Sequence, residues 1–242
     1  MMKEVCIYHI AEQFLFEYYC QPGEYGICEE DHAGELLSKG LSQEKRGGLM
    51  GALQSYEKAL AFNPVSTQIY FRLISVHFRL GQLEELFSRT KEVYPYLSTK
   101  AEMAQYYRWL GYYYLEKYQP ELSAALYRYS TLFSKSAQAE EEIRYLEAAM
   151  DRKLADDSER ELQEKLQKAG IPVTASNVTL ALLYRAGQEA LQHAKDAAGK
   201  NETATAKHWR QQALDCFSMI YDLTEDAQIK EEMEALSRMD LS

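Results

Sequence analysis

Cys20, Cys28 and His32 lie within a short stretch near the start of the chain, and thiolate and imidazole groups are ligands that zinc prefers. Structural zinc sites usually separate two cysteines by roughly two to four residues, and this stretch does not. The spacing favours separate, reduced or buried side chains, since a cysteine outside a disulfide often packs as a small apolar residue. We expect no metal and no cofactor. A small helical metalloenzyme is the least favoured alternative.

Other patterns of catalytic residues are not found. The sequence has no HExxH motif, phosphate-binding loop, GxSxG elbow or dinucleotide-binding glycine pattern. The remaining histidines are scattered at His9, His77, His193 and His208. The acidic run at residues 140–142 is typical of a solvated helix start. We therefore predict that the protein is not an enzyme and has no catalytic residues.

The charge balance limits the class of partner. The chain has 242 residues, with 27 basic and 37 acidic side chains and a net charge of −10. A surface with this excess of negative charge repels nucleic-acid phosphates and anionic lipids. No run of 18 uninterrupted apolar residues predicts a membrane span. We expect neither nucleic acid nor membrane as a partner.

The cysteines and the first residues indicate the compartment. Four cysteines in a chain of this length do not form a disulfide framework. His9, Glu12 and Glu17 interrupt the apolar stretch at the start, and no small-residue cleavage site follows it. We predict a cytoplasmic protein with reduced cysteines.

The elements that must position any site are predicted to be helices. Glycine and proline are scarce, at 12 and 5 residues, and the intervals between prolines have helical periodicity. Thr99 with Glu102 and Ser158 with Glu161 each match a capping box, in which side chains bond the free amides of a first helical turn. No segment has the alternation of a strand. The chain is predicted to be all-α.

An internal repeat occurs within this helical background. The segment from Ala52 to Pro64 places an aromatic residue four positions after a small one, then Ala59, then a proline. The pattern recurs after 34 residues and again after a further 37. The matching positions are Gly40, Gly47, Ala52, Tyr56 and Ala59; Ile74, Gly81, Leu86, Thr90 and Val93; and Gly111, Tyr118, Ser123, Tyr127 and Ser130. This pattern resembles the tetratricopeptide (TPR) repeat over about residues 33–137.

The resemblance implies a fold and a binding surface. TPR repeats form an α-α superhelix, a solenoid of antiparallel helix hairpins, whose first helices line a concave face. On the first helices that begin near residues 65 and 100, an aromatic and arginine groove is left beside the predicted buried stripes. Its residues are Phe71, Ser75, Phe78, Arg79, Arg108, Tyr112 and Glu116. The lysine and asparagine with which that family grips a terminal carboxylate are not at the matching positions, so that ligand is not predicted.

The segments outside the repeats are predicted to be helical as well. Residues 1–32 would form an N-terminal capping helix, near 3–20, and a loop; residues 33–137 three TPR-like hairpins; and residues 138–242 degenerate hairpins and a C-terminal capping helix near 225–239. The helix near 3–20 is apolar on nearly all sides and must be buried on more than one face. Capping the first repeat is favoured over filling the groove or forming a homodimer.

These features predict a non-catalytic protein- or peptide-binding scaffold that uses the concave face of the solenoid. Aromatic and arginine side chains are the usual anchors of such surfaces. The ligand expected for this groove is a protein or peptide with apolar side chains and some acidic character. The alternative is a peptide-sensing regulator that acts on a separate effector chain. Packing between repeats remains an equally open role for the groove residues.

Overall fold

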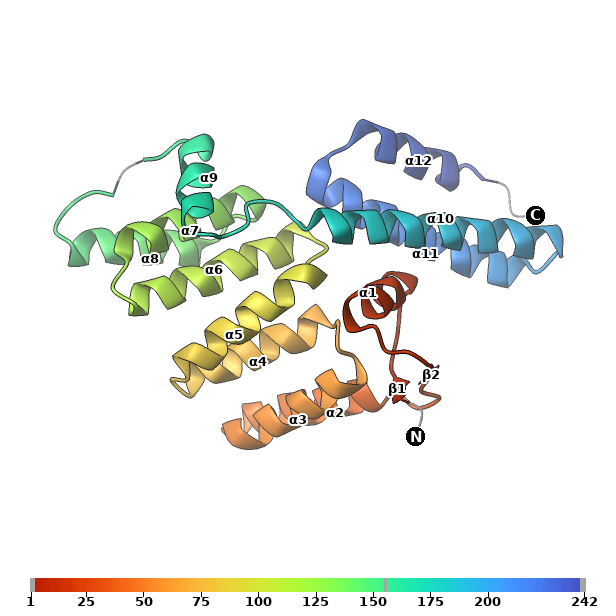
Figure 1. The fold of residues 1–242 in the computed structure, drawn as a ribbon, viewed down its shortest axis with the longest axis horizontal. Coiled ribbons are helices and arrows are strands. Elements are labelled where there is room, and N and C mark those ends of the chain that lie inside the picture. Colours follow the sequence, from red (N-terminus) through yellow and green to blue (C-terminus); the bar gives the residue numbers. More distant parts are fainter. Residues whose placement is uncertain (1–2, 155, 240–242) are drawn as a thin grey trace. The chain divides into compact units, whose positions relative to one another are not determined.

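A computed structural model describes residues 3–154 and 156–239 of the chain, which fold almost entirely into helices. Within these residues there are twelve α-helices, one 3-10 helix and two three-residue strands (Figure 1). The predicted all-α fold of antiparallel helix hairpins is confirmed. The described elements group into two compact units, one within residues 67–175 and the other within residues 1–66 and 176–242.

The unit formed by residues 67–175 is a stack of successive helices. Each helix packs on the next from α4 to α8, and α9 lies against α7 (Figure 1). Both predicted capping boxes are present, at Thr99 with Glu102 and at Ser158 with Glu161. The elements are α4 (Thr67–Arg79), α5 (Leu83–Val93), the 3-10 helix η1 (Tyr94–Tyr96), α6 (Lys100–Glu116), α7 (Pro120–Phe133), α8 (Ala137–Ala149) and α9 (Glu159–Lys168).

The other unit contains two hairpins and the N-terminal elements. One hairpin pairs α2 with α3, and a longer one pairs α10 with α11, on which α12 packs. The elements are β1 (Lys3–Val5), α1 (Ile10–Cys20), β2 (Tyr25–Ile27), α2 (His32–Lys45), α3 (Leu49–Phe62), α10 (Asn177–Gly199), α11 (Thr203–Thr224) and α12 (Ala227–Ser237). The predicted C-terminal helix near 225–239 therefore corresponds to α12.

A glycine that approaches an aromatic ring recurs in three of the hairpins. A Cβ atom added to the glycine would lie 2.3 to 3.2 Å from the ring that faces it, closer than side chains normally pack. The pairs are Gly40 with Tyr56, Gly111 with Tyr127 and Gly187 with Phe217. Ile74, at the matching position of α4, is fully buried. Two helices can approach closely only where the residue at the crossing is small, which is the physical basis of the repeat pattern.

The turns inside the hairpins repeat as well. Gly47 and Gly81, which end the turns after α2 and α4, have φ of 79° and 69°. Tyr118 has φ of 56° at the matching position after α6. Glycine adopts this left-handed conformation without the steric cost that a Cβ atom brings. The third turn therefore carries some backbone strain that the other two avoid.

The prediction that no segment forms a strand is wrong. Lys3–Val5 and Tyr25–Ile27 pair in parallel, with Val5 opposite Ile27. The amide of Cys6 then donates to the carbonyl of Phe62 at 2.8 Å, which ties β1 to the end of α3. Strands of three residues are too short to show alternation in a sequence, and their pairing depends on segments far apart in the chain.

The N-terminal helix is shorter than predicted, and its helix partner is a different one. The predicted helix near 3–20 begins only at Ile10, after β1. Its packing partner is α10, and Ile10 and Ala11 share a core cluster with Leu183 and Phe217. α1 thus packs on α10, while Glu12 of α1 also accepts from Asn63 at the end of α3, at 3.2 Å. The role of residues 1–32 as a cap of the first repeat stays a prediction. A homodimer through this helix stays a prediction.

The boundaries predicted at residues 32 and 137 differ from the grouping by contact. The hairpin of α2 and α3 groups with residues 176–242, whereas the two hairpins from α4 to α7 group with α8 and α9. The division into a cap, three TPR-like hairpins and a degenerate region follows the sequence pattern and stays a prediction. The two compact units, in contrast, are defined by which helices contact one another in the structure.

Candidate functional site

One face of α6 carries the side chains of the candidate site. Met103, Tyr107 and Leu110 point into the core of the stack and are almost fully buried. The residues that line a pocket on the other face are Gln105, Arg108, Trp109, Tyr112 and Leu115. Their spacing of three and four residues places them on one side of a helix, one above the other.

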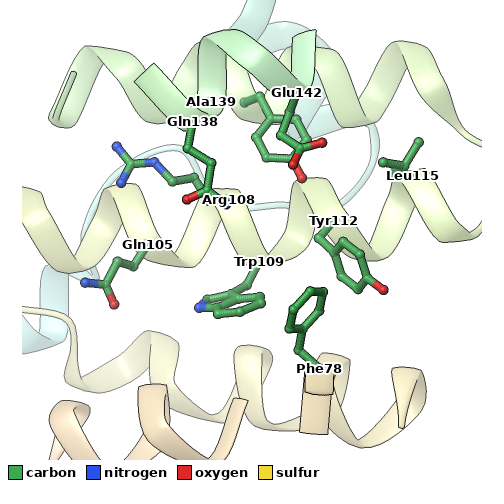
Figure 2. A pocket seen from close by; sticks show the side chains of 10 residues that line it. Phe78, Gln105, Arg108, Trp109, Tyr112, Leu115, Gln138, Ala139 and Glu142 are labelled. Carbon is green, nitrogen blue, oxygen red and sulfur yellow. The ribbon is translucent and has the colours of Figure 1, made fainter. Parts of the chain in front are cut away.

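A pocket of about 410 Å³ lies over this face of α6. Its other lining residues are Phe78 from α4, Tyr127 from α7, and Gln138, Ala139 and Glu142 from α8. Figure 2 shows α6 between Phe78 on one side and the α8 side chains on the other. The pocket is thus bordered by α4, α6 and α8, with Tyr127 of α7 beside them. Its volume falls in the range of pockets that bind small ligands or single side chains, roughly 300–1,000 Å³.

Aromatic rings form the wall toward α4. The ring of Phe78 meets that of Tyr112 edge to face, with centroids 4.8 Å apart, and lies 5.6 Å from the ring of Trp109. The side chain of Phe78 is 41% exposed, which is unusual for a phenylalanine in a helical stack. The partly exposed ring of Phe78, packed against the rings of Trp109 and Tyr112, forms an apolar surface suited to an apolar side chain of a partner.

Arg108 supplies the positive charge at the pocket. One of its terminal nitrogens, Nη2, donates to the carbonyl oxygen of Ser134 at 2.6 Å, at the C-terminal end of α7. Its Nε atom is buried and donates to no acceptor in the described part of the chain. Burial lowers the pKa of the guanidinium from its ordinary value, although it stays charged at neutral pH. Arg108 therefore stabilises the end of α7 and places a positive charge beside the pocket.

Carboxylates give the opposite part of the pocket a negative charge. Burial, together with the nearby carboxylates of Glu116 and Glu142, raises the pKa of Tyr112. Burial and the charge of Glu142 also raise the pKa of Tyr127. Both tyrosines thus remain neutral hydrogen-bond donors at physiological pH. Figure 2 shows Arg108 and Gln105 toward one end of the pocket, with Tyr112 and Leu115 toward the other.

The predicted groove residues are only partly brought together. Phe78, Arg108 and Tyr112 line the pocket, whereas Phe71, Ser75, Arg79 and Glu116 are not among its lining residues. Phe71 precedes Phe78 by two turns of α4, which corresponds to about 10 Å along the helix axis. Because the pocket lies at the C-terminal end of α4, residues at its start do not reach it.

Sequence reasoning missed several lining residues. Gln105 and Trp109 lie one turn from Arg108 and Tyr112 on α6, so extending the predicted face by helical spacing would have found them. Gln138 and Glu142 come from α8, where the repeat pattern has faded. No local pattern marked these two residues.

The residues considered as zinc ligands are distributed over three elements. Cys20 ends α1, Cys28 follows β2, and His32 begins α2 with its ring 5.1 Å from that of Phe62. Among the described residues, no group of three or more histidine, cysteine or acidic side chains is arranged to hold a metal ion. Nor does any helix there have the length and apolar character needed to cross a bilayer.

Comparison with known proteins gives the following relationships. No family model matches the chain, and no curated protein matches it. One similar solved structure is YrrB, described as a TPR protein with an unusual peptide-binding site, with 14% identity and a TM-score of 0.42 over 86% of this chain and 94% of that chain. Another is a TPR repeats protein from Bacteroides fragilis, with 14% identity and a TM-score of 0.36 over 87% of this chain and 100% of that chain. Both of these structures are TPR proteins, the family that the repeats of this sequence resemble.

Proposed function

We propose that the protein is a non-catalytic scaffold that binds a peptide segment of a partner protein in the pocket over α6. The observation that carries the proposal is the aromatic wall of the pocket, in which the ring of Phe78 packs against the rings of Trp109 and Tyr112, beside the positive charge of Arg108. Exposed aromatic and arginine side chains that border a concave pocket are the usual anchors of binding energy. The proposal places this activity in the cytoplasm.

The chemistry of the pocket defines the expected ligand. An aromatic or long aliphatic side chain would fill the space over Trp109 and contact the ring of Phe78. A carbonyl or carboxylate oxygen of the same segment would be attracted by the positive charge of Arg108. Because Glu142 lies beside Tyr112, a second acidic group near α8 would be repelled there. The expected ligand is therefore an apolar segment with a single acceptor placed toward Arg108.

The test is selection of ligands from a displayed library of random peptides, followed by calorimetric titration of the selected peptides. Trp109→Ala and Tyr112→Ala should each weaken binding by roughly thirtyfold or more, which corresponds to about 2 kcal/mol. Neither ring makes a hydrogen bond that ends a helix, so helicity should be retained. Arg108→Ala should weaken binding too, but it also removes the bond to Ser134 and should lower the melting temperature.

The matched control is Tyr145→Ala, because Tyr145 lies on α8, is 64% exposed and does not line the pocket. It should leave the affinity unchanged. Selected peptides that bind the Trp109 and Tyr112 variants as tightly as the unmodified protein would show that the partner binds elsewhere. Unfolding of both variants would identify these rings as packing between hairpins.

A further inference from the structure

Cys6 and Cys28 follow directly after the two strands of the parallel sheet. Val5 lies opposite Ile27, and the amide of Cys28 donates to the carbonyl of Val5 at 2.9 Å, which continues the ladder by one residue. Cys6 and Cys28 therefore occupy the next pair of opposed positions, with side chains on the same side of the sheet. Neighbouring strands lie about 4.8 Å apart, within the separation of about 4.4–6.8 Å between the Cα atoms of a disulfide.

Hydrogen bonds fix the backbone and the thiol of Cys6. Its amide donates to Phe62, and its Sγ atom accepts from the amide of Ala33 at 3.4 Å, at the start of α2. Its own thiol proton points to the carbonyl of Glu30 at 3.9 Å. The side chain is 4% exposed. Cys6 is thus held in one place, so that only a partner positioned beside it can react with it.

Cys28 is the accessible member of the pair. It is only partly buried, whereas Cys6 is buried. Burial and a hydrogen bond with the Cys6 side chain raise the pKa of Cys28 to about 11. The strand register, continued by the bond from the amide of Cys28 to Val5, places the two side chains beside each other. The sulfur of Cys28 can react with a small disulfide from solution. The buried sulfur of Cys6 is then the neighbour that can react with the mixed disulfide formed on Cys28.

We propose that Cys6 and Cys28 form a redox-active dithiol that closes to a disulfide by exchange with a low-molecular-weight disulfide. In the first step, Cys28 loses its proton to solvent, and its sulfur attacks one sulfur of the small disulfide and releases the other half as a thiolate, which takes up a proton. In the second, Cys6 loses its proton to solvent and attacks the Cys28 sulfur, which releases the second half as a thiol. Two protein thiols are oxidised to one disulfide, and one small disulfide is reduced to two thiols.

Closure would join β1 to β2 and enclose the whole of α1 in a covalent loop. The other two cysteines lie in different surroundings. Cys20 is the last residue of α1, and Cys216 is fully buried in α11, where burial raises its pKa to about 12. Because Cys216 is fully buried, a disulfide in solution cannot reach its sulfur, whereas Cys28 is partly exposed. The pair of Cys6 and Cys28 should therefore react as a unit, separately from both.

The experiment equilibrates the full chain with glutathione and glutathione disulfide, traps the remaining thiols with an alkylating reagent and maps the cysteines by mass spectrometry. No lysine or arginine lies between Glu4 and Ser38, so trypsin leaves Cys6, Cys20 and Cys28 in one peptide. Cleavage after glutamate separates them into residues 5–12, 18–24 and 25–29. We expect loss of two of the four thiols and one linked product that joins 5–12 to 25–29.

Three variants complete the test. Cys28→Ser should abolish the linked product, and Cys6→Ser should do the same if it folds. Cys20→Ser is the matched control and should leave the product unchanged. A linkage that involves residues 18–24 in the native protein would overturn the proposal. The proposal would also be overturned if the folded protein kept all four thiols at a ratio of glutathione to glutathione disulfide that oxidises the urea-unfolded chain.

Discussion

His9 combines a helix cap and a titratable group in one side chain. Its Nδ1 atom accepts from the amide of Ala11 at 3.0 Å and so caps α1. An accepting Nδ1 carries no proton, so the neutral ring carries its proton on Nε2, which lies 3.6 Å from a carboxylate oxygen of Asp215. Burial lowers the pKa of His9 below 6.5, opposed by Asp215 and reinforced by His208.

This arrangement predicts a loss of stability in mild acid. The unfolded chain binds the proton first as the pH falls, because the pKa of His9 is lower in the folded state. The free energy of unfolding should therefore decrease as the pH falls from 6.5 toward the folded pKa. We expect a loss of a few tenths up to about 1 kcal/mol at pH 5.5, since solvent and Asp215 offset part of the burial. Urea unfolding at pH 7.5 and at pH 5.5 measures this difference in the free energy of unfolding.

The matched variant is His9→Ser, because serine caps helices well and does not titrate. The loss between the two pH values should be smaller in this variant than in the unmodified chain. Burial raises the pKa of nearby Glu12, which adds stability as the pH falls and is common to both proteins. An equal pH dependence in the two proteins would show that folding does not lower the pKa of His9.

At the scale of elements, three tyrosines hold the segment that follows α9. Tyr94 of η1, Tyr107 of α6 and Tyr129 of α7 donate to the carbonyls of Thr174, Pro172 and Val173, at 2.9, 3.0 and 2.6 Å. This tyrosine clasp satisfies three successive backbone carbonyls of a segment that has no regular structure of its own. Extended backbone needs such partners where it is not exposed to water.

The clasp predicts that removing a tyrosine hydroxyl lowers the stability of the protein where that hydroxyl donates to the segment, and not where the tyrosine is exposed. Tyr107→Phe and Tyr129→Phe should each lower the free energy of unfolding by about 1 kcal/mol, because each leaves a carbonyl without its donor. Amide hydrogen exchange within residues 171–175 should become faster. Tyr118→Phe is the control, since Tyr118 is 94% exposed, and it should change neither quantity. Unaltered exchange in both buried variants would mean that ring packing alone holds the segment.

The elements also show what the sequence could and could not predict. The face of α6 was predictable because the small residue at Gly111 and the rings around it repeat a pattern with a known spacing. Gln138 and Glu142 of α8 were not, since amphipathic helices without a motif do not reveal which neighbour they will face. The strands and the docking of Ile10 on α10 depend on contacts between distant segments, which no local periodicity encodes.

At the scale of the whole molecule, one compact unit is continuous in sequence and the other is not. Residues 67–175 contain α4 to α9 without interruption, whereas the remaining unit combines residues 1–66 with 176–242. In that discontinuous unit, Ile10 and Ala11 are buried in a cluster with residues of α10, α11 and α12. A chain with this organisation should separate into one segment that folds alone and two that need each other.

Expression of fragments tests this prediction. Residues 67–175 alone should be helical by circular dichroism and melt cooperatively, because the packing of successive helices from α4 to α8, and of α9 on α7, lies within the fragment. Residues 1–66 alone should be less helical than in the full chain, because Ile10, Ala11 and the rest of the face of α1 lose the surface of α10. Mixing residues 1–66 with 176–242 should restore helicity beyond the sum of the separate spectra. Strict additivity on mixing would mean that the α1–α10 contact contributes little to folding, and that the α2–α3 hairpin folds as an independent repeat.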